Sequence, residues 1–267
     1  MSVSTSTNRL TSRMQSIARE GRKAFIAYIM AGDPSWEATR SLAFALDRAG
    51  VAAVELGVPF SDPIADGQAI QEAGLRALAG GVTLRRIFEQ VELIRENTDI
   101  PILLMGYWNV FLQYGGERTV RRAVQAGVDG FIIADLPPDS GRAFYEAAAG
   151  EGLCSVLLAS GLTSPGRLRL IAERSSGFIY FVPQPGTTGL ELAITDDVRD
   201  RIRAVKELTD TPVCVGIGVK TREDVRTLGG ISDGVVVGTR LVRHIHENRD
   251  RPDLADGTAR LVRSLMG

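Results

Sequence analysis

Cysteine and histidine are scarce in this chain, and their scarcity excludes several kinds of chemistry. Only two of each occur among 267 residues. Cys154 and Cys214 both lie in apolar segments, which favours reduced thiols in the core over a disulfide. His244 and His246 stand two positions apart, so a helix would turn them to different faces and away from a shared metal ion. We therefore expect no metal site, no disulfide framework and no serine–histidine–aspartate arrangement.

The chain also lacks an excess of charge and lacks long apolar runs. Its 31 basic residues are balanced by 32 acidic ones, and the net charge is -1. No broad attraction to nucleic acid or to a membrane surface is therefore expected. No apolar run approaches the roughly 20 residues of a membrane span. The first eight residues are polar, unlike a signal peptide, and together with the reduced thiols this predicts a cytoplasmic protein.

What the chain does contain is an alternation of short apolar runs with longer, charged stretches of helical pattern. The runs are nearly continuous in apolar residues, as is typical of parallel strands buried on both faces. Eight strand–helix units predict an α/β fold, a (β/α)8 or TIM barrel, with residues 1–267 forming a single domain. An open doubly wound sheet is the alternative, because periodicity does not distinguish a closed sheet from an open one. The expected strands are 24–31, 51–58, 100–105, 128–134, 153–158, 177–182, 212–216 and 234–237, with extra helices at 11–19, ahead of the first strand, and at 254–265.

Two carboxylates mark the second of these strands and the loop after it. Glu55 interrupts an apolar run, and Asp66 lies eleven positions further on, in a proline-rich segment. A carboxylate in a core strand is unfavourable unless it is paired or protonated. Two carboxylates in different surroundings suggest an acid/base pair. The alternative is that Glu55 pairs with a basic side chain inside the barrel and Asp66 is a turn residue.

Glycines follow each of the last three expected strands. They occur within 186–189, at 216 and 218, and at Gly238, which precedes Thr239. Barrels of this type often bind phosphate through backbone N–H groups of the last loops and a helix N-terminus. The pattern predicts a phosphate site, although each glycine could instead begin a turn between strand and helix.

Other polar and aromatic residues also stand where expected strands end. Tyr107 and Asn109 follow the third strand and would form a wall of the site or pack the barrel rim. Asp135 follows the fourth strand and would orient a residue in the substrate site or cap the following helix. Tyr180 lies within the sixth strand. All of these positions belong to the end of a barrel that carries its chemistry.

The segment from Glu55 to Gly67, ELGVPFSDPIADG, resembles the tryptophan synthase α subunit family, and the resemblance extends over nearly the whole chain. That family has a TIM barrel fold and cleaves indole-3-glycerol phosphate to indole and glyceraldehyde 3-phosphate by a retro-aldol reaction. The resemblance implies a carbon–carbon lyase of tryptophan biosynthesis without a cofactor of its own. It also implies a pyridoxal-phosphate β subunit as partner, in an α2β2 heterotetramer. Further matches are Asn8-Arg9, 31–34, Ile70-Gln71, Tyr107 with Asn109, 134–137, Tyr180, and Gly238-Thr239.

The same resemblance implies roles for individual residues. Glu55 would protonate C3 of the indole ring and accept the glycerol hydroxyl proton as the C–C bond breaks. Asp66 would accept a hydrogen bond from the indole N–H and stabilise the positive charge that develops there. Thr188 would hold Asp66 when the loop after the sixth strand closes. The other expected substrate contacts are Tyr107 and Tyr180 as lining, Asp135, and the phosphate-binding backbone of Gly189, Gly218, Gly238 and Thr239.

Several residues near the expected substrate depart from the family pattern. Lys220 and Arg240 add two cations near the expected phosphate and would suit a diphosphate or another phosphate ester. Two alternatives therefore accompany the lyase hypothesis. One is a paralogue in secondary metabolism with a different phosphorylated substrate. The other is a weakly catalytic subunit that activates a β subunit through residues 59–62 and Asn109. The chain also departs from the family pattern at Met30, Gln68, 159–162, 183–185, Thr187 and Ile217.

Overall fold

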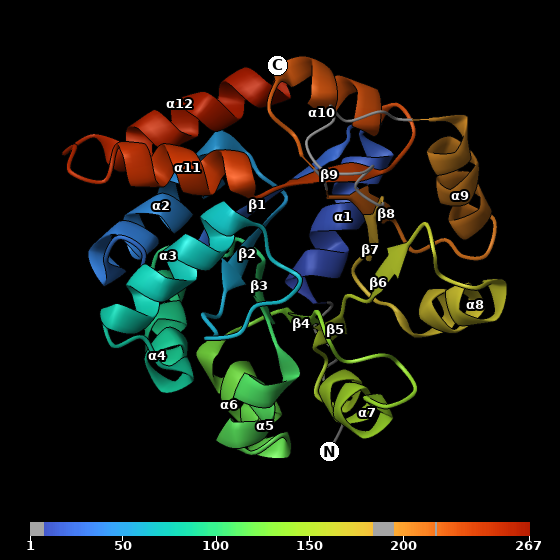
Figure 1. Cartoon of the computed structure of the whole chain (residues 1–267), viewed down its shortest axis with the longest axis horizontal. Helices are drawn as coiled ribbons and strands as arrows, with labels where there is room; N and C mark the ends of the chain where they lie inside the picture. The colour runs from blue at the N-terminus through green and yellow to red at the C-terminus, as the bar shows by residue number, and fades with distance from the viewer. Residues whose placement is uncertain (1–7, 184–194, 217) are drawn as a thin grey trace.

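The strands of this protein form one parallel sheet in the order β5-β4-β3-β2-β1-β9-β8-β7-β6 (Figure 1). A computed structural model of the chain describes residues 8–183, 195–216 and 218–267. The strands are β1 (Ala24–Met30), β2 (Ala53–Gly57), β3 (Ile102–Gly106), β4 (Gly130–Ile133), β5 (Cys154–Ser155), β6 (Leu158–Ser160), β7 (Ile179–Val182), β8 (Val213–Val215) and β9 (Gly234–Val237).

The sheet closes through an interrupted strand. The expected fifth strand, 153–158, occurs as two pieces: β5 pairs with β4, and β6 pairs with β7. Between the pieces, the N–H of Val156 donates to the carbonyl of Phe131 at 3.0 Å. On the other side, the N–H of Tyr180 donates to the carbonyl of Leu157, also at 3.0 Å. One continuous segment thus bonds to both ends of the sheet, so the predicted eight-stranded barrel is confirmed over the open alternative.

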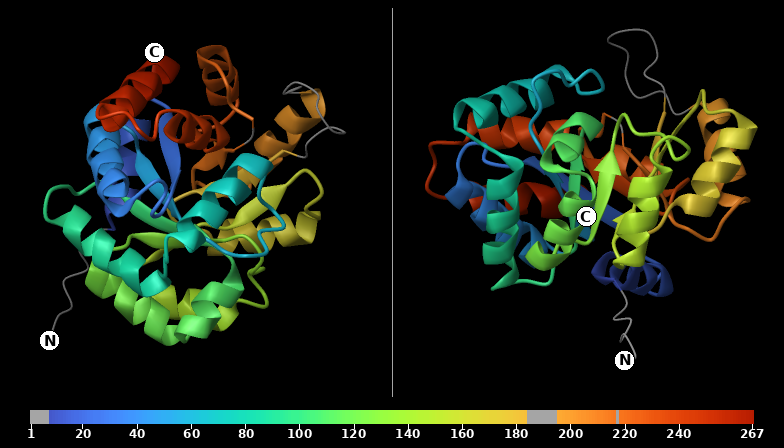
Figure 2. Two further views of the ribbon diagram at one scale, coloured as in Figure 1. Left: turned by 60° about the vertical axis from the view of Figure 1, so that its left-hand side comes forward. Right: turned by 90° about the horizontal axis from the view of Figure 1, so that it is seen from below.

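Helices surround the barrel, as both views in Figure 2 show. The predicted extra helices are present as α1 and α12, which extend slightly beyond the expected bounds. None of the helices in the described part of the chain combines the length and apolar character needed to cross a membrane. The helices are α1 (Arg9–Arg19), α2 (Trp36–Ala49), α3 (Gln68–Ala79), α4 (Leu84–Arg95), α5 (Trp108–Tyr114), α6 (Glu117–Ala126), α7 (Arg142–Gly150), α8 (Pro165–Arg174), α9 (Asp196–Lys206), α10 (Arg222–Gly229), α11 (Thr239–Glu247) and α12 (Leu254–Met266).

Helix α1 closes the end of the barrel at which the strands begin. The side chain of Asn8 caps this helix by accepting a hydrogen bond from the N–H of Leu10 at 2.9 Å. The spacing of Leu10, Met14 and Ile17 places all three on one face. That face packs against residues from the barrel interior, in a core separate from the larger one between the barrel and the outer helices. The opposite end of the barrel is therefore the one left open for a site.

Candidate active site

Glu55 lies inside the barrel, in the middle of β2. Its register neighbours are Tyr28 on β1 and Leu103 on β3. The side chain is fully buried, and neither carboxylate oxygen has a hydrogen-bond partner among the described residues. Burial raises the pKa of Glu55 to about 8. No described basic side chain pairs with it, so Glu55 is protonated at neutral pH and can donate a proton.

Asp66 lies on the loop between β2 and α3, and its side chain is half-buried. Burial raises the pKa of Asp66 to about 6, and a hydrogen bond with Tyr107 partly offsets that rise. At neutral pH this carboxyl group is therefore mostly ionised. Glu55 and Asp66 thus have opposite protonation states at neutral pH, which is the arrangement expected of an acid/base pair.

Two tyrosines share the open end of the barrel with these carboxyl groups. Burial raises the pKa of both Tyr28 and Tyr180 well above the ordinary value, and the charges of Glu55 and Asp66 raise it further. The four side chains are therefore close enough to interact electrostatically. Tyr28 was not anticipated from the sequence. The sequence did offer one indication of it, because Tyr28 is the one aromatic residue at the inward-facing positions of β1.

Glycines make room for the two tyrosine hydroxyl groups. A Cβ atom at Gly57 would collide with the Tyr28 hydroxyl, and one at Gly216 would collide with the Tyr180 hydroxyl. Gly57 ends β2 directly after the strand segment that carries Glu55, and Gly216 follows β8. Both glycines therefore allow close approach of a ring to the backbone, in addition to the phosphate role expected for the second.

Tyr107 holds the loop that carries Asp66. Its buried ring stacks on Phe60, with ring centroids 5.3 Å apart. Its hydroxyl oxygen accepts a hydrogen bond from the N–H of Ala65 at 3.0 Å. Burial and the charge of Asp66 raise the pKa of Tyr107 to about 12, so the hydroxyl stays protonated. The residue expected to line the site is thus bonded to the backbone next to the second carboxylate.

Asp135 makes a structural contact at the rim of the barrel. Its carboxylate accepts a hydrogen bond from the N–H of Trp108 at 2.6 Å, at the start of α5. It therefore caps the helix after the neighbouring third strand. The alternative expectation, that Asp135 caps the helix after its own strand, is wrong, because α7 starts several residues further along the chain. A contact between Asp135 and the substrate stays a prediction.

Strands β8 and β9 end beside the N-terminus of helix α11, which is suited to binding an anion. Gly238 is the N-cap residue of α11 and supplies no side-chain cap, and Thr239 is the first helical residue. The N–H groups of a first helical turn have no partner within the helix. Gly218 follows the adjacent strand β8 with a φ of 52°. Thr188, Gly189 and Ile217 lie outside the described residues.

The two additional cations differ in their placement. Lys220 is exposed, and its backbone N–H donates to Asp224 at 2.8 Å, near the start of α10. Arg240 lies in the first turn of α11 and is partly buried. Among the described residues, no group of three or more His, Cys, Asp or Glu side chains is arranged to hold a metal ion.

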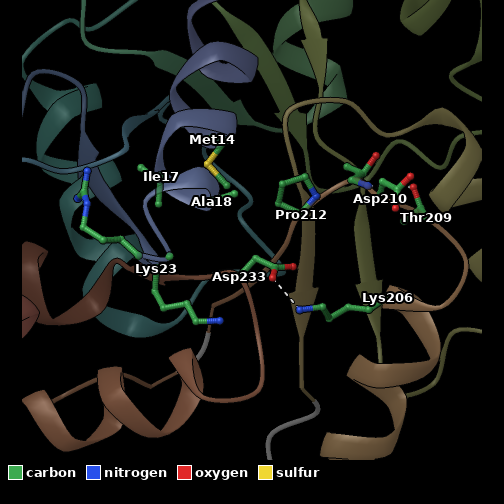
Figure 3. A pocket seen from close by; sticks show the side chains of 12 residues that line it. Met14, Ile17, Ala18, Lys23, Lys206, Thr209, Asp210, Pro212 and Asp233 are labelled. Carbon is green, nitrogen blue, oxygen red and sulfur yellow. Dashed lines mark hydrogen bonds and ion pairs between the residues drawn. The ribbon is translucent and has the colours of Figure 1, made fainter.

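A cavity of about 370 Å³ lies at the other end of the barrel (Figure 3). It is lined by α1 and by the segments that lead into β1, β8 and β9. An ion pair between Lys206 and Asp233, with 2.6 Å between nitrogen and oxygen, crosses one side of it. None of the candidate site residues in the described part of the chain lines this cavity, so it is separate from the carboxylates.

Two large apolar side chains are exposed on the Asp66 loop and on the helix that follows it. Ile64 is 87% exposed, and Leu75 on α3 is 59% exposed. A further cavity of about 250 Å³ lies beside the same loop, lined by residues that include Pro59, Phe60 and Val110.

Comparison with known proteins agrees with this architecture. The family model of the tryptophan synthase alpha chain matches residues 14–263. The tryptophan synthase alpha chain of Geobacter sp. (strain M21) is 41% identical over 240 residues, which cover 90% of each chain. Tryptophan synthase subunit alpha from Legionella pneumophila superposes with a TM-score of 0.89, at 32% identity, over 98% of both chains. A chain in the tryptophan synthase a2b2 complex of Pyrococcus furiosus gives a TM-score of 0.84 at 39% identity, covering 91% of this chain and 98% of that one. The chain described here therefore belongs to the tryptophan synthase alpha chain family.

Proposed function

We propose that Glu55 and Asp66 are the carboxyl groups with which this lyase cleaves indole-3-glycerol phosphate to indole and glyceraldehyde 3-phosphate, with the chain 1–267 acting as one domain. The observation that carries the proposal is the contrast between the two groups at the open end of the barrel. Burial keeps Glu55 protonated at neutral pH, while Asp66 is mostly ionised. A retro-aldol cleavage needs one group of each kind.

Glu55 acts first as an acid and then as a base. Its proton goes to C3 of the indole ring, and the ring nitrogen becomes positively charged. The resulting carboxylate accepts the proton of the adjacent glycerol hydroxyl. As the C–C bond breaks, its electron pair returns to the ring and the hydroxyl carbon becomes the aldehyde. Glu55 ends the cycle protonated, so no external acid or base is consumed.

Asp66 stabilises the charge that forms in the first step. Its carboxylate accepts a hydrogen bond from the indole N–H, which becomes a stronger donor once C3 is protonated. This interaction is stronger in the transition state than in the bound substrate, so it accelerates the reaction rather than only tightening binding. The hydrogen bond between Tyr107 and Ala65 supports this role, because it fixes the backbone beside Asp66.

The phosphate group would bind at the start of α11. N–H groups of Gly238 and Thr239, together with Gly218 from the adjoining loop, would bind the dianion, and the helix N-terminus favours its charge. Gly189 would add a further N–H, and Thr188 would hold Asp66 after loop closure. Tyr180 would line the indole pocket. These contacts orient the substrate so that C3 faces Glu55.

The direct test is indole release from indole-3-glycerol phosphate by the purified protein. We expect wild-type turnover and a loss of roughly 10³-fold or more for Glu55→Gln, since general acid–base catalysis contributes about 10²–10⁴-fold. The circular dichroism spectrum of the variant should match that of the wild type. Absence of indole in the wild-type assay, or cleavage only of other phosphate or diphosphate esters tested in parallel, would overturn the assignment.

We further infer that the protein acts in the cytoplasm beside a β subunit. The Pyrococcus furiosus relative forms an a2b2 complex. The exposed apolar side chain of Ile64, on the Asp66 loop, supports a similar partner here. The buried free thiols Cys154 and Cys214 suit a reducing compartment.

A further inference from the structure

The loop that carries Asp66 is bonded on its outer side to the helix that follows it. Gln71 lies in the first turn of α3, and its side-chain amide donates to the backbone carbonyl of Asp66 at 2.8 Å. A weaker bond from the same amide, at 3.4 Å, reaches the carbonyl of Pro63. With the Tyr107–Ala65 bond on the barrel side, the backbone around Asp66 is thus held from two directions.

Helix α3 is itself fixed to the loop that follows β1. Arg76 forms a bidentate ion pair with Asp33. The Nε atom of Arg76 lies 2.9 Å from Oδ1 of Asp33, and its Nη2 atom lies 2.8 Å from Oδ2. The Asp33 side chain is 3% exposed and that of Arg76 is 31% exposed. Such paired, charge-assisted bonds restrict orientation as well as distance. The position of α3 along the barrel rim therefore depends on this ion pair.

Helix α3 also passes beside Met30 on β1. A Cβ atom built at Gly74 on α3 would lie 3.6 Å from the terminal methyl of Met30 on β1, which is an ordinary contact distance. Gly74 and Met30 are both buried. A methyl group on α3 would therefore fit beside Met30, so the position of the helix depends on the ion pair rather than on tight packing at this point.

We propose that Arg76, acting through Asp33, is a positioning residue for Asp66. The ion pair fixes α3 to the loop after β1, and Gln71 transmits that position to the backbone of Asp66. This inference rests on the proposed function of Asp66. A displacement of about 1 Å between a catalytic group and its substrate can lower a rate about 10²-fold, so an anchor three helical turns from the loop affects the charge-stabilising step.

The experiment compares three variants of the full chain. Arg76→Met breaks the ion pair and keeps much of the side-chain length. Arg76→Lys keeps the charge but loses the two-pronged geometry. Arg122→Met is the matched control, because Arg122 on α6 pairs with Glu92 on α4 at 2.7 Å, on the outer wall of the barrel. The measurements are kcat, KM, melting temperature, and hydrogen exchange at the Ala65 amide.

We expect Arg76→Met to lower kcat about 10- to 100-fold with KM changed less than threefold, and Arg76→Lys to recover part of that loss. Exchange at the Ala65 amide should accelerate in Arg76→Met and stay at the wild-type rate in Arg122→Met. If Arg76→Met lowers only the melting temperature, as the control does, the ion pair is merely structural and the inference is wrong. If Arg76→Met does not fold, the same outcomes are read from Arg76→Lys and from Gln71→Met.

The exchange measurement separates this inference from the proposed function. A wild-type protein that releases no indole overturns the function, whatever the variants do. Faster exchange at the Ala65 amide in Arg76→Met would still show that the ion pair holds the loop. Normal indole release with unchanged kcat and unchanged exchange in Arg76→Met would overturn the inference alone.

Discussion

At the scale of single residues, the chemistry depends on how differently two carboxyl groups are buried. Glu55 is enclosed by the barrel and has no partner among the described side chains. Asp66 is on a loop, partly exposed, and accepts a hydrogen bond from Tyr107. Desolvation destabilises the charged form of both groups, but more strongly for Glu55. The pKa of Glu55 is therefore higher than that of Asp66 because Glu55 is buried more deeply.

This order predicts a bell-shaped dependence of kcat/KM on pH. Activity should rise as Asp66 loses its proton near pH 6 and fall as Glu55 loses its proton near pH 8. The measurement is the initial rate of indole release from about pH 4.5 to about pH 10, at constant ionic strength so that charge screening does not change. Asp66→Asn should remove the acidic limb and leave the alkaline one. A profile with no alkaline limb would contradict the role of Glu55 as the initial acid.

The sequence anticipated these two residues but not all of their surroundings. An acidic residue inside an apolar run can be recognised from the sequence alone, so Glu55 could be identified as a candidate. Tyr28 lies in a run with no other sign of function and approaches the site only because β1 and β2 are neighbours in the barrel. Its contact with Gly57 depends on that pairing, which strand patterns do not specify.

At the scale of elements, the periodic pattern predicted the strands well where they are long. The fifth strand is the exception, because its two pieces bond to different neighbours. The sequence also did not reveal that a residue of one strand–helix unit caps the helix of another. The side chain that caps α5 comes from the loop after β4, 27 positions away along the chain, whereas cap rules consider only the residues next to a helix.

We predict that Asp135→Ala lowers the free energy of unfolding by about 1 kcal/mol, the usual effect of losing an N-terminal cap. The reason is that the N–H of Trp108 loses a charged acceptor. Asp139→Ala is the control, since Asp139 pairs with Arg167 at an exposed site, where an ion pair contributes about 0–1 kcal/mol. Denaturant unfolding measures both. Equal, small losses would show that Asp135 is not a cap in solution.

At the scale of the whole molecule, the two ends of the barrel have different roles. Helix α1 closes one end with Leu10, Met14 and Ile17. The other end carries the carboxylates, the start of α11 and the loop with exposed Ile64. The product indole is apolar and would leave from this second end. A partner that consumes indole is therefore best placed on the surface beside the Asp66 loop.

We expect the protein to form a larger complex when mixed with the tryptophan synthase β subunit of the same organism. Size-exclusion chromatography with light scattering measures this directly. Ile64→Asp should weaken the complex, because it replaces an exposed apolar side chain on the Asp66 loop with a charged one. Leu208→Asp is the control, since Leu208 is also exposed but follows α9, at the end of the barrel where β8 begins. A wild-type mass that does not change on mixing would contradict the partnership.

The succession of strands and helices, the family and the two carboxylates could all be predicted from the amino-acid sequence. Each of these is carried by residues close together along the chain. The folded chain established that the barrel closes through an interrupted strand, because closure depends on hydrogen bonds to both neighbouring strands. It also decided the pKa order of Glu55 and Asp66, which follows from burial, and the ion pair between Arg76 and Asp33. Those two residues are 43 positions apart, and only folding brings their charges together.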